Sequence, residues 1–363
     1  MANAPRPPAS GTWMTGSLLR VDVAELAPYV PGDQPHGSGW VKLNTNEHPD
    51  VLPGINDAVR RVIDGQLRLY PDPTCSELRE RLSERYGIRP EQIIVGNGSD
   101  ELLALALRAC VDPGDRVVTP YPTYSVYRTL AEIHGAHFLE IDSNERFALP
   151  IGELVRGSGR VTFIAHPNAP TGKPVSHDDM AALCEGVSGV VVADEAYVDF
   201  GAASTLPLLS RYPNLLITRT MSKGFGLAGL RIGYAFGSED LVGGLYKVKD
   251  SYNVNRLSQW AGIAALAKYD LAMAANRRLA RRRDELADTL RTAFGWSVWP
   301  SRTNFLLAEP QARPAVKVYE ALRERRVLVR HFAQRRLEPY VRISVGSESD
   351  HIALVGALRE LLV

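Results

Sequence analysis

The sequence predicts an α/β fold in which helices cover a mostly parallel central sheet, followed by a smaller α/β domain. Between about residues 93 and 236, short apolar and β-branched runs alternate with segments of helical pattern. Such near-continuous apolar runs are typical of strands with helices on both faces, and their alternation with helices favours a parallel sheet. Beyond Asp250 the pattern becomes mainly helical, and only short strands follow.

The positions of these runs give the individual elements. Strands of the central sheet are expected over 93–95, 116–119, 137–141, 161–165, 189–193, 215–219 and 232–236. Helices are expected over 100–110 and 124–135. In the second domain we expect a helical region over 257–294, strands over 304–308, 327–330 and 341–345, and a closing helix. The predicted segments are a disordered tail over 1–17, an N-terminal arm over 18–45, a large domain over 46–250 and a small C-terminal domain over 251–363.

Composition narrows the class of protein. The 363 residues carry a formal net charge of +1, with 45% apolar and 23% charged residues, which is ordinary for a soluble globular protein and points to no nucleic-acid partner. No apolar run reaches the ~18 residues that span a membrane. The three cysteines form no CxxC pair, and the eight histidines show no metal-ligand spacing. We therefore expect a cytoplasmic protein without a disulfide or metal site. The arginines between 277 and 283 are interpreted as the solvated face of a long helix.

Two stretches at strand ends contain candidate site residues. The first, Gly-Asn-Gly-Ser-Asp-Glu over 96–101, lets the backbone turn tightly and presents a helix N-terminus that suits a phosphate, although it also fits a plain helix cap. The second, 190–197, is a buried strand that ends in Asp194 and Glu195. Ligands in open α/β sheets bind at this end of the strands. An acid there can pair with a ring nitrogen, hold a metal or simply cap a helix.

A third stretch, 218–231, places Lys223 just past a strand end among glycines and hydroxyls, with Arg231 eight positions on. A lysine in such a site can act as a nucleophile toward carbonyl groups. The stretch also contains a formal GxGxxG over 224–229. A dinucleotide-binding fingerprint should open a helix, but the residues after Arg231 have strand character. We therefore reject the dinucleotide interpretation.

Together these stretches resemble the fold-type-I pyridoxal-phosphate (PLP) aminotransferases, and most closely the histidinol-phosphate aminotransferase family. The motifs that carry the resemblance, in the expected order, are 26–32, 43–47, 70–72, 122–124, 193–197, 222–231 and 341–346. They span nearly the whole chain. The resemblance implies a large PLP-binding domain with a mostly parallel sheet and a smaller C-terminal α/β domain.

The resemblance also implies roles around the cofactor ring. Lys223 would carry PLP as a Schiff base and later shuttle a proton. Asp194 would pair with the protonated pyridine nitrogen, which keeps the ring an electron sink. Tyr197 would donate to the phenolic oxygen of the cofactor, and Tyr124 would stack on the ring.

Further implied roles concern the phosphate and the substrate. Residues expected to bind the cofactor phosphate are Ser99, Asp100, Ser222 and Arg231, with Glu101 beside them. Tyr70 would reach the phosphate of the other subunit, so the active unit would be a homodimer. Residues expected to bind substrate are Tyr29, Asn46, Arg330 and Arg342, of which Arg342 would grip a carboxylate as a planar fork.

The chain departs from the family at one position. The family commonly has Asn immediately before Pro-Thr-Gly, where its amide touches the phenolic oxygen of PLP, but here Ala169 stands there and Asn168 lies one residue earlier. Either Asn168 serves instead or Tyr197 makes that contact alone. His166, just ahead of this turn, is interpreted as a core residue rather than a substrate contact.

The reaction implied by the resemblance is a two-stage transamination. Histidinol phosphate and 2-oxoglutarate would yield imidazole acetol phosphate and glutamate, as in histidine biosynthesis. Transamination of aromatic amino acids is the first alternative, and a decarboxylation like that of threonine phosphate is the second. A nucleotide-dependent oxidoreductase is a remote alternative. The expected partners are a small amino donor, a 2-oxo acid and a second copy of the chain.

Overall fold

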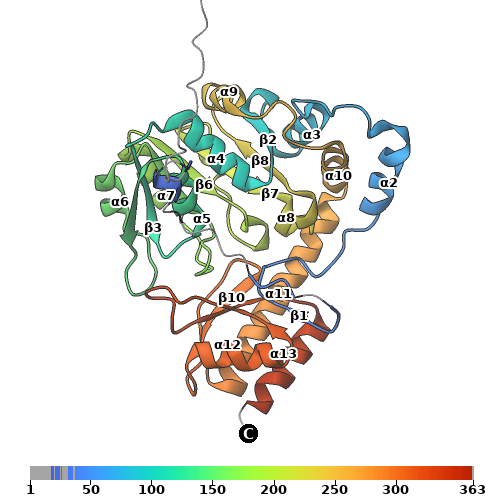
Figure 1. Ribbon diagram of the computed structural model, residues 1–363, viewed down its shortest axis with the longest axis vertical. Coiled ribbons are helices and arrows are strands. Elements are labelled where there is room, and N and C mark those ends of the chain that lie inside the picture. The colour runs from blue at the N-terminus through green and yellow to red at the C-terminus, as the bar shows by residue number, and fades with distance from the viewer. Residues whose placement is uncertain (1–17, 20, 25, 27–31, 36, 362–363) are drawn as a thin grey trace, which may run out of the picture.

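The computed structural model describes residues 18–361 except 20, 25, 27–31 and 36 (Figure 1). These residues form two larger sheets and one two-stranded sheet. The largest has seven strands in the order β2-β8-β7-β6-β5-β3-β4. Its strands are β2 (Ile93–Asn97), β3 (Arg116–Tyr121), β4 (His137–Asp142), β5 (Val161–Ala165), β6 (Val190–Asp194), β7 (Leu215–Thr220) and β8 (Ile232–Phe236). The predicted strands are confirmed to within two residues at each end.

The large sheet is parallel except at β8, which runs antiparallel to both β2 and β7. Between β7 and β8 the chain has only the short helix α8 (Met221–Gly224) and a turn, η4 (Ala228–Leu230). A parallel crossover needs a dozen or more residues, so this short connection returns the chain antiparallel. Lys223 and Arg231 lie on this connection, which brings both close to the ends of β7 and β8.

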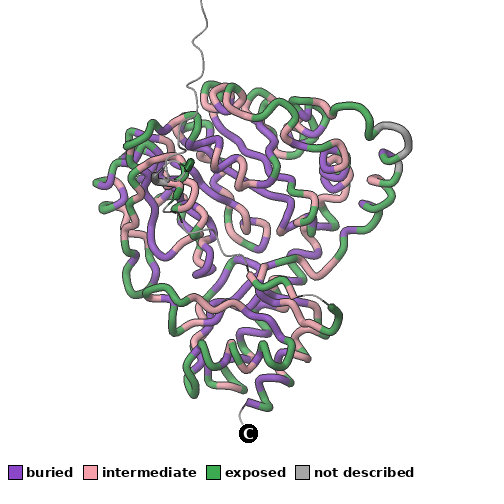
Figure 2. Tube along the Cα trace, viewed as in Figure 1, coloured by how far each residue is buried: buried purple, intermediate pink, exposed green. Residues whose placement is uncertain are grey.

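Helices cover both faces of this sheet. They are α2 (Ile55–Gln66), α3 (Ser76–Tyr86), α4 (Ser99–Cys110), α5 (Val126–Ile133), α6 (Ile151–Gly157), α7 (His177–Gly186), α9 (Glu239–Val248) and α10 (Arg256–Leu266). Alternate strand residues enter opposite cores: Val191 packs in one hydrophobic cluster and Val192 in the other. The strands are therefore buried on both sides (Figure 2), which explains their continuous apolar runs.

The second sheet is antiparallel, in the order β12-β13-β10-β9, and has its own hydrophobic core. Its strands are β9 (Ser297–Val298), β10 (Phe305–Glu309), β12 (Arg330–His331) and β13 (Val341–Ser344). Helices α12 (Ala315–Glu324) and α13 (Glu348–Glu360) pack on it, and the long helix α11 (Tyr269–Phe294) runs from the large sheet toward it (Figure 1).

The N-terminal arm joins this smaller unit. A short helix, α1 (Val21–Ala24), precedes β1 (Val41–Lys42), which pairs in parallel with β11 (Val327–Leu328). The strand predicted over 327–330 is therefore divided, because its first half pairs with β1 and its second half, β12, pairs with β13. The tail over 1–17 lies outside the described residues, and the domain boundaries at 45 and 250 stay predictions.

The interpretation of the arginine stretch on α11 is wrong in one respect. Arg277, Arg278 and Arg281 are exposed, but the side chain of Arg283 is only 2% exposed. Its guanidinium donates to the carbonyls of Phe200 and Thr303, 3.2 and 3.0 Å away, and so ties α11 to both units. Nothing in the local sequence distinguishes the buried Arg283 from the other four arginines of this stretch.

No helix among the described residues is both long and apolar enough to cross a membrane.

Candidate active site

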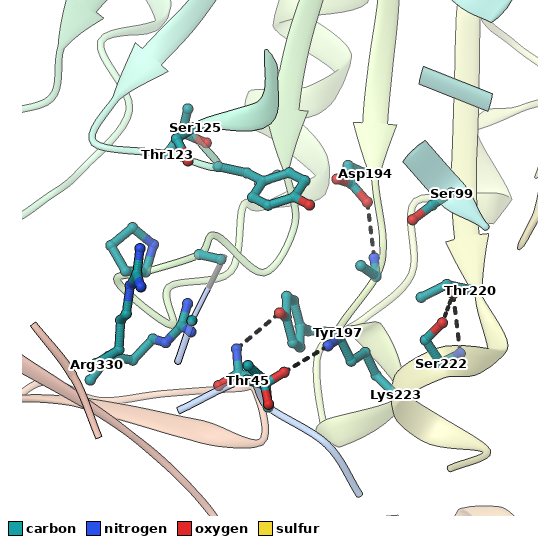
Figure 3. Close-up of a pocket in the computed structure, with 18 of the residues that line it drawn as sticks. Thr45, Ser99, Thr123, Ser125, Asp194, Tyr197, Thr220, Ser222, Lys223 and Arg330 are labelled. Atoms are coloured by element: carbon teal, nitrogen blue, oxygen red, sulfur yellow. Dashed lines mark hydrogen bonds between the residues drawn. The ribbon is translucent and has the colours of Figure 1, made fainter. Parts of the chain in front are cut away.

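A cavity of about 260 Å³ lies at the carboxyl ends of the central strands, where the two units meet. The large unit contributes the ends of β6 and β7, the start of α4 and the loop after β3, and the small unit contributes residues of β12 and β13. Figure 3 shows Ser99, Thr220 and Ser222 at one end of the cavity and Arg330 at the other, with Asp194, Tyr197 and Lys223 between them.

Asp194 ends β6 and is 5% exposed. Its Oδ2 accepts a hydrogen bond of 2.7 Å from the hydroxyl of Tyr127, and its Oδ1 accepts one of 3.2 Å from the backbone N–H of Ala196. Burial raises the pKa of Asp194 to about 6, and the bond from Tyr127 opposes that rise. The fixed carboxylate therefore suits a cationic partner in the cavity, which would favour its charged form.

Tyr127 is a site residue that sequence reasoning missed. It is fully buried on α5, and its ring stacks on Phe163 with centroids 4.7 Å apart. It lies three positions after Tyr124, which lines the cavity from the segment just before α5, and the two rings meet edge to face with centroids 5.5 Å apart. That i, i+3 spacing was the available signal, but the sequence does not indicate that Asp194 lies beside the helix.

Lys223 follows β7 on α8, whose first turn is capped by the side chain of Thr220. Its Nζ donates to the backbone carbonyl of Thr45, 3.1 Å away, and lies 5.8 Å from the centre of the Tyr197 ring (Figure 3). Thr220 and Thr45 both line the cavity and were not assigned roles from the sequence. The lysine is thus held by a segment 178 positions away along the chain.

One end of the cavity is built to bind an anion. Gly98, with φ of +85°, precedes Ser99 at the start of α4, and a Cβ atom at Gly98 would lie 2.6 Å from Nη2 of Arg231. A Cβ atom at Gly233 would lie 2.3 Å from the carbonyl carbon of Gly98, so both glycines are required for this approach. Arg231 also pairs with Asp100 at 3.1 Å. The helix N-terminus, the guanidinium and the hydroxyls of nearby residues together form a cradle whose chemistry suits a phosphate.

The opposite end carries two arginines. Arg330 and Arg342 are partners in the β12–β13 register, and both line the cavity. Their guanidinium carbons lie 5.7 and 5.5 Å from the centre of the Phe332 ring, and Arg342 also donates to the carbonyl of Asn44 at 2.9 Å. Because two guanidinium groups pack near the same aromatic ring, this end of the cavity favours an anionic group.

A buried ion pair lies behind the site. Glu195 follows Asp194, and its carboxylate accepts from Nε and Nη2 of Arg219 at 2.9 and 2.7 Å. Burial disfavours the charged carboxylate, but Arg219, His166 and the hydrogen bonds from Thr205 together outweigh it and keep the pKa of Glu195 lowered. Because Arg219 lies on β7, the pair locks the ends of β6 and β7 together.

Several residues predicted for the site lie outside the cavity lining. Glu101 instead accepts from the side-chain amide of Asn253 at 2.8 Å. Tyr70 is 76% exposed and stacks on Tyr252 with ring centres 4.4 Å apart. Tyr29 lies outside the described residues.

At the turn where the chain departs from the family, Ala169 rather than Asn168 lines the cavity. The Asn168 amide donates to Pro122 O at 3.0 Å and to Thr171 Oγ1 at 2.8 Å. His166 is 1% exposed; its Nε2 lies 2.7 Å from Ala203 O, and its Nδ1 accepts from Val175 N–H. The interpretation of His166 as a core residue is confirmed.

Comparison with known proteins decides the family. The sequence profile of the class I and II aminotransferases matches residues 38–358. The chain belongs to the class I and II aminotransferases. It is 44% identical to histidinol-phosphate aminotransferase 1 of Trichormus variabilis, over 95% of this chain and 99% of that protein, and 42% identical to histidinol-phosphate aminotransferase of Chromohalobacter salexigens, over 93% and 96%.

The fold is shared with solved members of this family. The crystal structure of histidinol-phosphate aminotransferase from Sinorhizobium meliloti, in complex with pyridoxal-5'-phosphate, matches with a TM-score of 0.87 at 24% identity and covers 96% of this chain and 98% of that one. The predicted fold-type-I architecture is therefore confirmed, and the chain is a PLP-dependent aminotransferase.

The residues of the cavity fit PLP by the chemistry of their side chains. The cofactor needs a place for its phosphate, an acid for its ring nitrogen and an amine for its carbonyl carbon. The cradle between Gly98 and Arg231, the buried carboxylate of Asp194 and the amine of Lys223 supply these three groups within one cavity.

Proposed function

We propose that this aminotransferase transfers the amino group of histidinol phosphate to 2-oxoglutarate, which yields imidazole acetol phosphate and glutamate. The observation that carries the proposal is the arrangement of one cavity with a phosphate cradle at one end and two arginines at the other. The relatives named histidinol-phosphate aminotransferase, 37–44% identical over almost the whole chain, support the substrate.

In this proposal the cofactor supplies a carbonyl that accepts the amine and a ring that withdraws electrons from the reacting carbon. Asp194 holds a proton on the ring nitrogen through its buried carboxylate, which Tyr127 keeps in place. Tyr197 donates to the phenolic oxygen, and Tyr124 covers one face of the ring. Lys223 holds the cofactor and then moves a proton to and from the substrate carbon with its Nζ.

The substrate end must accept two anions of different shape. Histidinol phosphate carries a phosphate on its hydroxymethyl group, whereas 2-oxoglutarate carries two carboxylates. Arg342 offers a bidentate fork to either, and Arg330 beside it adds a second cation. Both arginines are therefore assigned to anion binding in both halves of the reaction.

A substrate panel tests the proposed donor. The cofactor-loaded enzyme is mixed with one amino donor at a time, and the visible absorbance of the bound cofactor is followed in a single turnover. We expect histidinol phosphate to remove this absorbance fastest, and phenylalanine and threonine phosphate to leave it nearly unchanged. Fast reaction with phenylalanine and none with histidinol phosphate would make the enzyme an aromatic aminotransferase. Release of CO₂ from threonine phosphate would make it a decarboxylase.

A second part of the proposal is that the active unit is a cytoplasmic homodimer with shared sites. Tyr70 and its stacking partner Tyr252 are 76% and 46% exposed, and the nearby Leu67 and Leu69 are 55% and 48% exposed. Contiguous exposed apolar side chains of this kind mark protein interfaces. Tyr70 is assigned to the cofactor phosphate of the second subunit, which explains why it lies outside the cavity of its own chain.

Subunit mixing tests this arrangement. Inactive Lys223→Ala subunits are exchanged with Tyr70→Ala subunits, and exchange is verified by mass. If Tyr70 acts across the interface, both lesions fall in one site of the mixed dimer and the other site is intact, so activity rises above that of either parent. Verified exchange without a gain in activity would mean that Tyr70 does not serve the partner's site.

A further inference from the structure

Asn46 lines the cavity, as expected of a predicted substrate-binding residue, and it is also held by contacts within the protein. It is 2% exposed and adopts a left-handed backbone conformation with φ of +57°, which is uncommon outside glycine. Its backbone carbonyl accepts from the side-chain amide of Asn304 at 2.9 Å, and its backbone N–H donates to Oγ of Ser344 at 2.9 Å. Both partners belong to the small unit, so that unit holds Asn46 in its strained conformation.

The hydrogen bonds of Ser344 determine which way the Asn46 amide faces. Oγ of Ser344 accepts from the Asn46 backbone, so its hydroxyl hydrogen is available for Oδ1 of Asn46, 2.7 Å away. Because this contact occupies the amide oxygen, the amide nitrogen must face the opposite side. There Nδ2 of Asn46 lies 3.0 Å from the hydroxyl of Tyr197.

The direction of that bond defines the role of the Tyr197 hydroxyl. An amide N–H only donates, so the Tyr197 oxygen is the acceptor, and its own hydrogen remains for a second partner. The ring is fixed in place by Phe305, which meets it edge to face with centroids 5.1 Å apart. The charged groups around it are Lys223, 5.8 Å from the ring centre, and Arg342, which lies against Phe305.

We propose that Asn46 is a positioning residue that keeps the Tyr197 hydroxyl as a donor toward the phenolic oxygen of PLP, with Ser344 setting the orientation of Asn46. This inference rests on the proposed function of the cavity. The Tyr197 hydroxyl matters more in this chain because Ala169, which has no polar side chain to contact the phenolic oxygen, lines the cavity where the family commonly has Asn. The small unit thereby reaches the cofactor through the hydrogen-bonded series Ser344, Asn46 and Tyr197.

Asn46→Asp tests the direction of the bond with little change in size. A carboxylate has no N–H, so Tyr197 would donate to it and stop donating to the cofactor. A donor to the phenolic oxygen stabilises its negative charge, so its loss should raise the pH midpoint of the cofactor absorbance change by ~1 pH unit. Tyr197→Phe should cause a rise of similar size. Asn214→Asp is a matched control, because the Asn214 amide donates to two backbone carbonyls away from the cavity.

A double-mutant cycle separates this effect from that of the added charge. If Asn46 acts through Tyr197, Asn46→Asp should shift the midpoint by less than ~0.3 pH unit in the Tyr197→Phe background. Additive shifts would overturn the inference, because a carboxylate acting through space does not need the hydroxyl. An unchanged midpoint in Asn46→Asp would also overturn it.

Ser344→Ala keeps the test usable if Asn46→Asp fails to bind the cofactor. Without the serine hydroxyl the amide can reverse, so the midpoint should rise by less than in Asn46→Asp, and the rise should vanish in the Tyr197→Phe background. A midpoint equal to that of the wild type would contradict the inference. Borohydride trapping on the wild type distinguishes the two levels of failure: a cofactor found away from Lys223 refutes the proposed function, whereas a cofactor on Lys223 with additive shifts refutes only the role of Asn46.

Discussion

The two ends of the cavity are built in different ways. The end that suits the cofactor phosphate comes from neighbouring strand ends and connections of one sheet, whose glycines, helix start and guanidinium fit together within contact distance. The end with the two arginines is assembled from the small unit and is joined to the N-terminal arm through Arg342 and Asn44. From this comparison we expect changes in the large unit to affect the chemistry most, and changes at the two arginines of the small unit to affect substrate binding most.

Removing the lysine should cause the largest loss. Lys223→Ala deletes both the amine that holds the cofactor and the group that moves the proton, so turnover should fall below detection. Steady-state assays with the donor and acceptor measure it, and circular dichroism checks the fold. Lys249→Ala is the control, because that lysine lies outside the cavity lining and bonds to the nearby loop. Substantial turnover by Lys223→Ala would show that Lys223 is not the residue that holds the cofactor and moves the proton.

Asp194→Asn should cause the next largest loss. It preserves the shape but removes the charge that favours a protonated ring nitrogen. We expect a rate loss on the order of 10²-fold or more, ~3 kcal/mol of barrier, with PLP still bound. Stopped-flow measurement of the first half-reaction gives the rate, and absorbance gives the cofactor content. A near-normal rate would show that the charge of Asp194 does not contribute to the reaction and that its role is structural.

Arg342→Lys tests the arginine end of the cavity. It keeps the positive charge and loses the planar fork, so binding in both half-reactions should weaken by ~1.5–3 kcal/mol, on the order of 10- to 100-fold. Single-turnover rates against histidinol phosphate and against 2-oxoglutarate measure the two halves separately. Arg335→Lys is the control, because Arg335 pairs with Asp142 outside the cavity lining. A defect confined to the oxo-acid half would place the substrate phosphate elsewhere.

Tyr127→Phe should have the smallest effect, which we expect as a change in how the free energy of unfolding depends on pH. The pKa of Asp194, about 6 in the folded chain, exceeds its ordinary value of 3.8. Its contribution to the free energy of unfolding is therefore present below about pH 4 and is lost as the pH rises through about 6. The bond from Tyr127 lowers this pKa, so its removal should move the upper limit of that window to higher pH.

Denaturant unfolding of the cofactor-free protein between pH 4 and 8 measures this change. The matched control is Tyr86→Phe, which removes a partly buried hydrogen bond of 2.9 Å to Tyr234 away from the cavity. An identical pH profile for the wild type and Tyr127→Phe would show that Tyr127 does not set the charge of Asp194.

The residues that line the cavity were easier to predict from the sequence than the contacts that hold them, and the two arginines of the substrate end were predicted as well. Asp194, Ser222, Lys223 and Arg231 lie where strands end, so local pattern and motif order located them. Contacts between distant segments were not predictable: Tyr127 meets Asp194 from another helix, and Thr45 meets Lys223 across 178 positions. Such contacts depend on packing, which periodicity does not encode. Asn168 illustrates the limit, because a one-residue shift at a turn directed it away from the cavity.

Reductive trapping tests the central claim most directly, namely that Lys223 carries PLP in the site that takes histidinol phosphate. Borohydride reduction followed by peptide mass mapping should find the pyridoxyl group on Lys223. Prior incubation with histidinol phosphate, without an oxo acid, should abolish that label, whereas phenylalanine should leave it. A pyridoxyl group on another lysine would contradict the assignment of the site. A label on Lys223 that histidinol phosphate does not remove would contradict the proposed substrate.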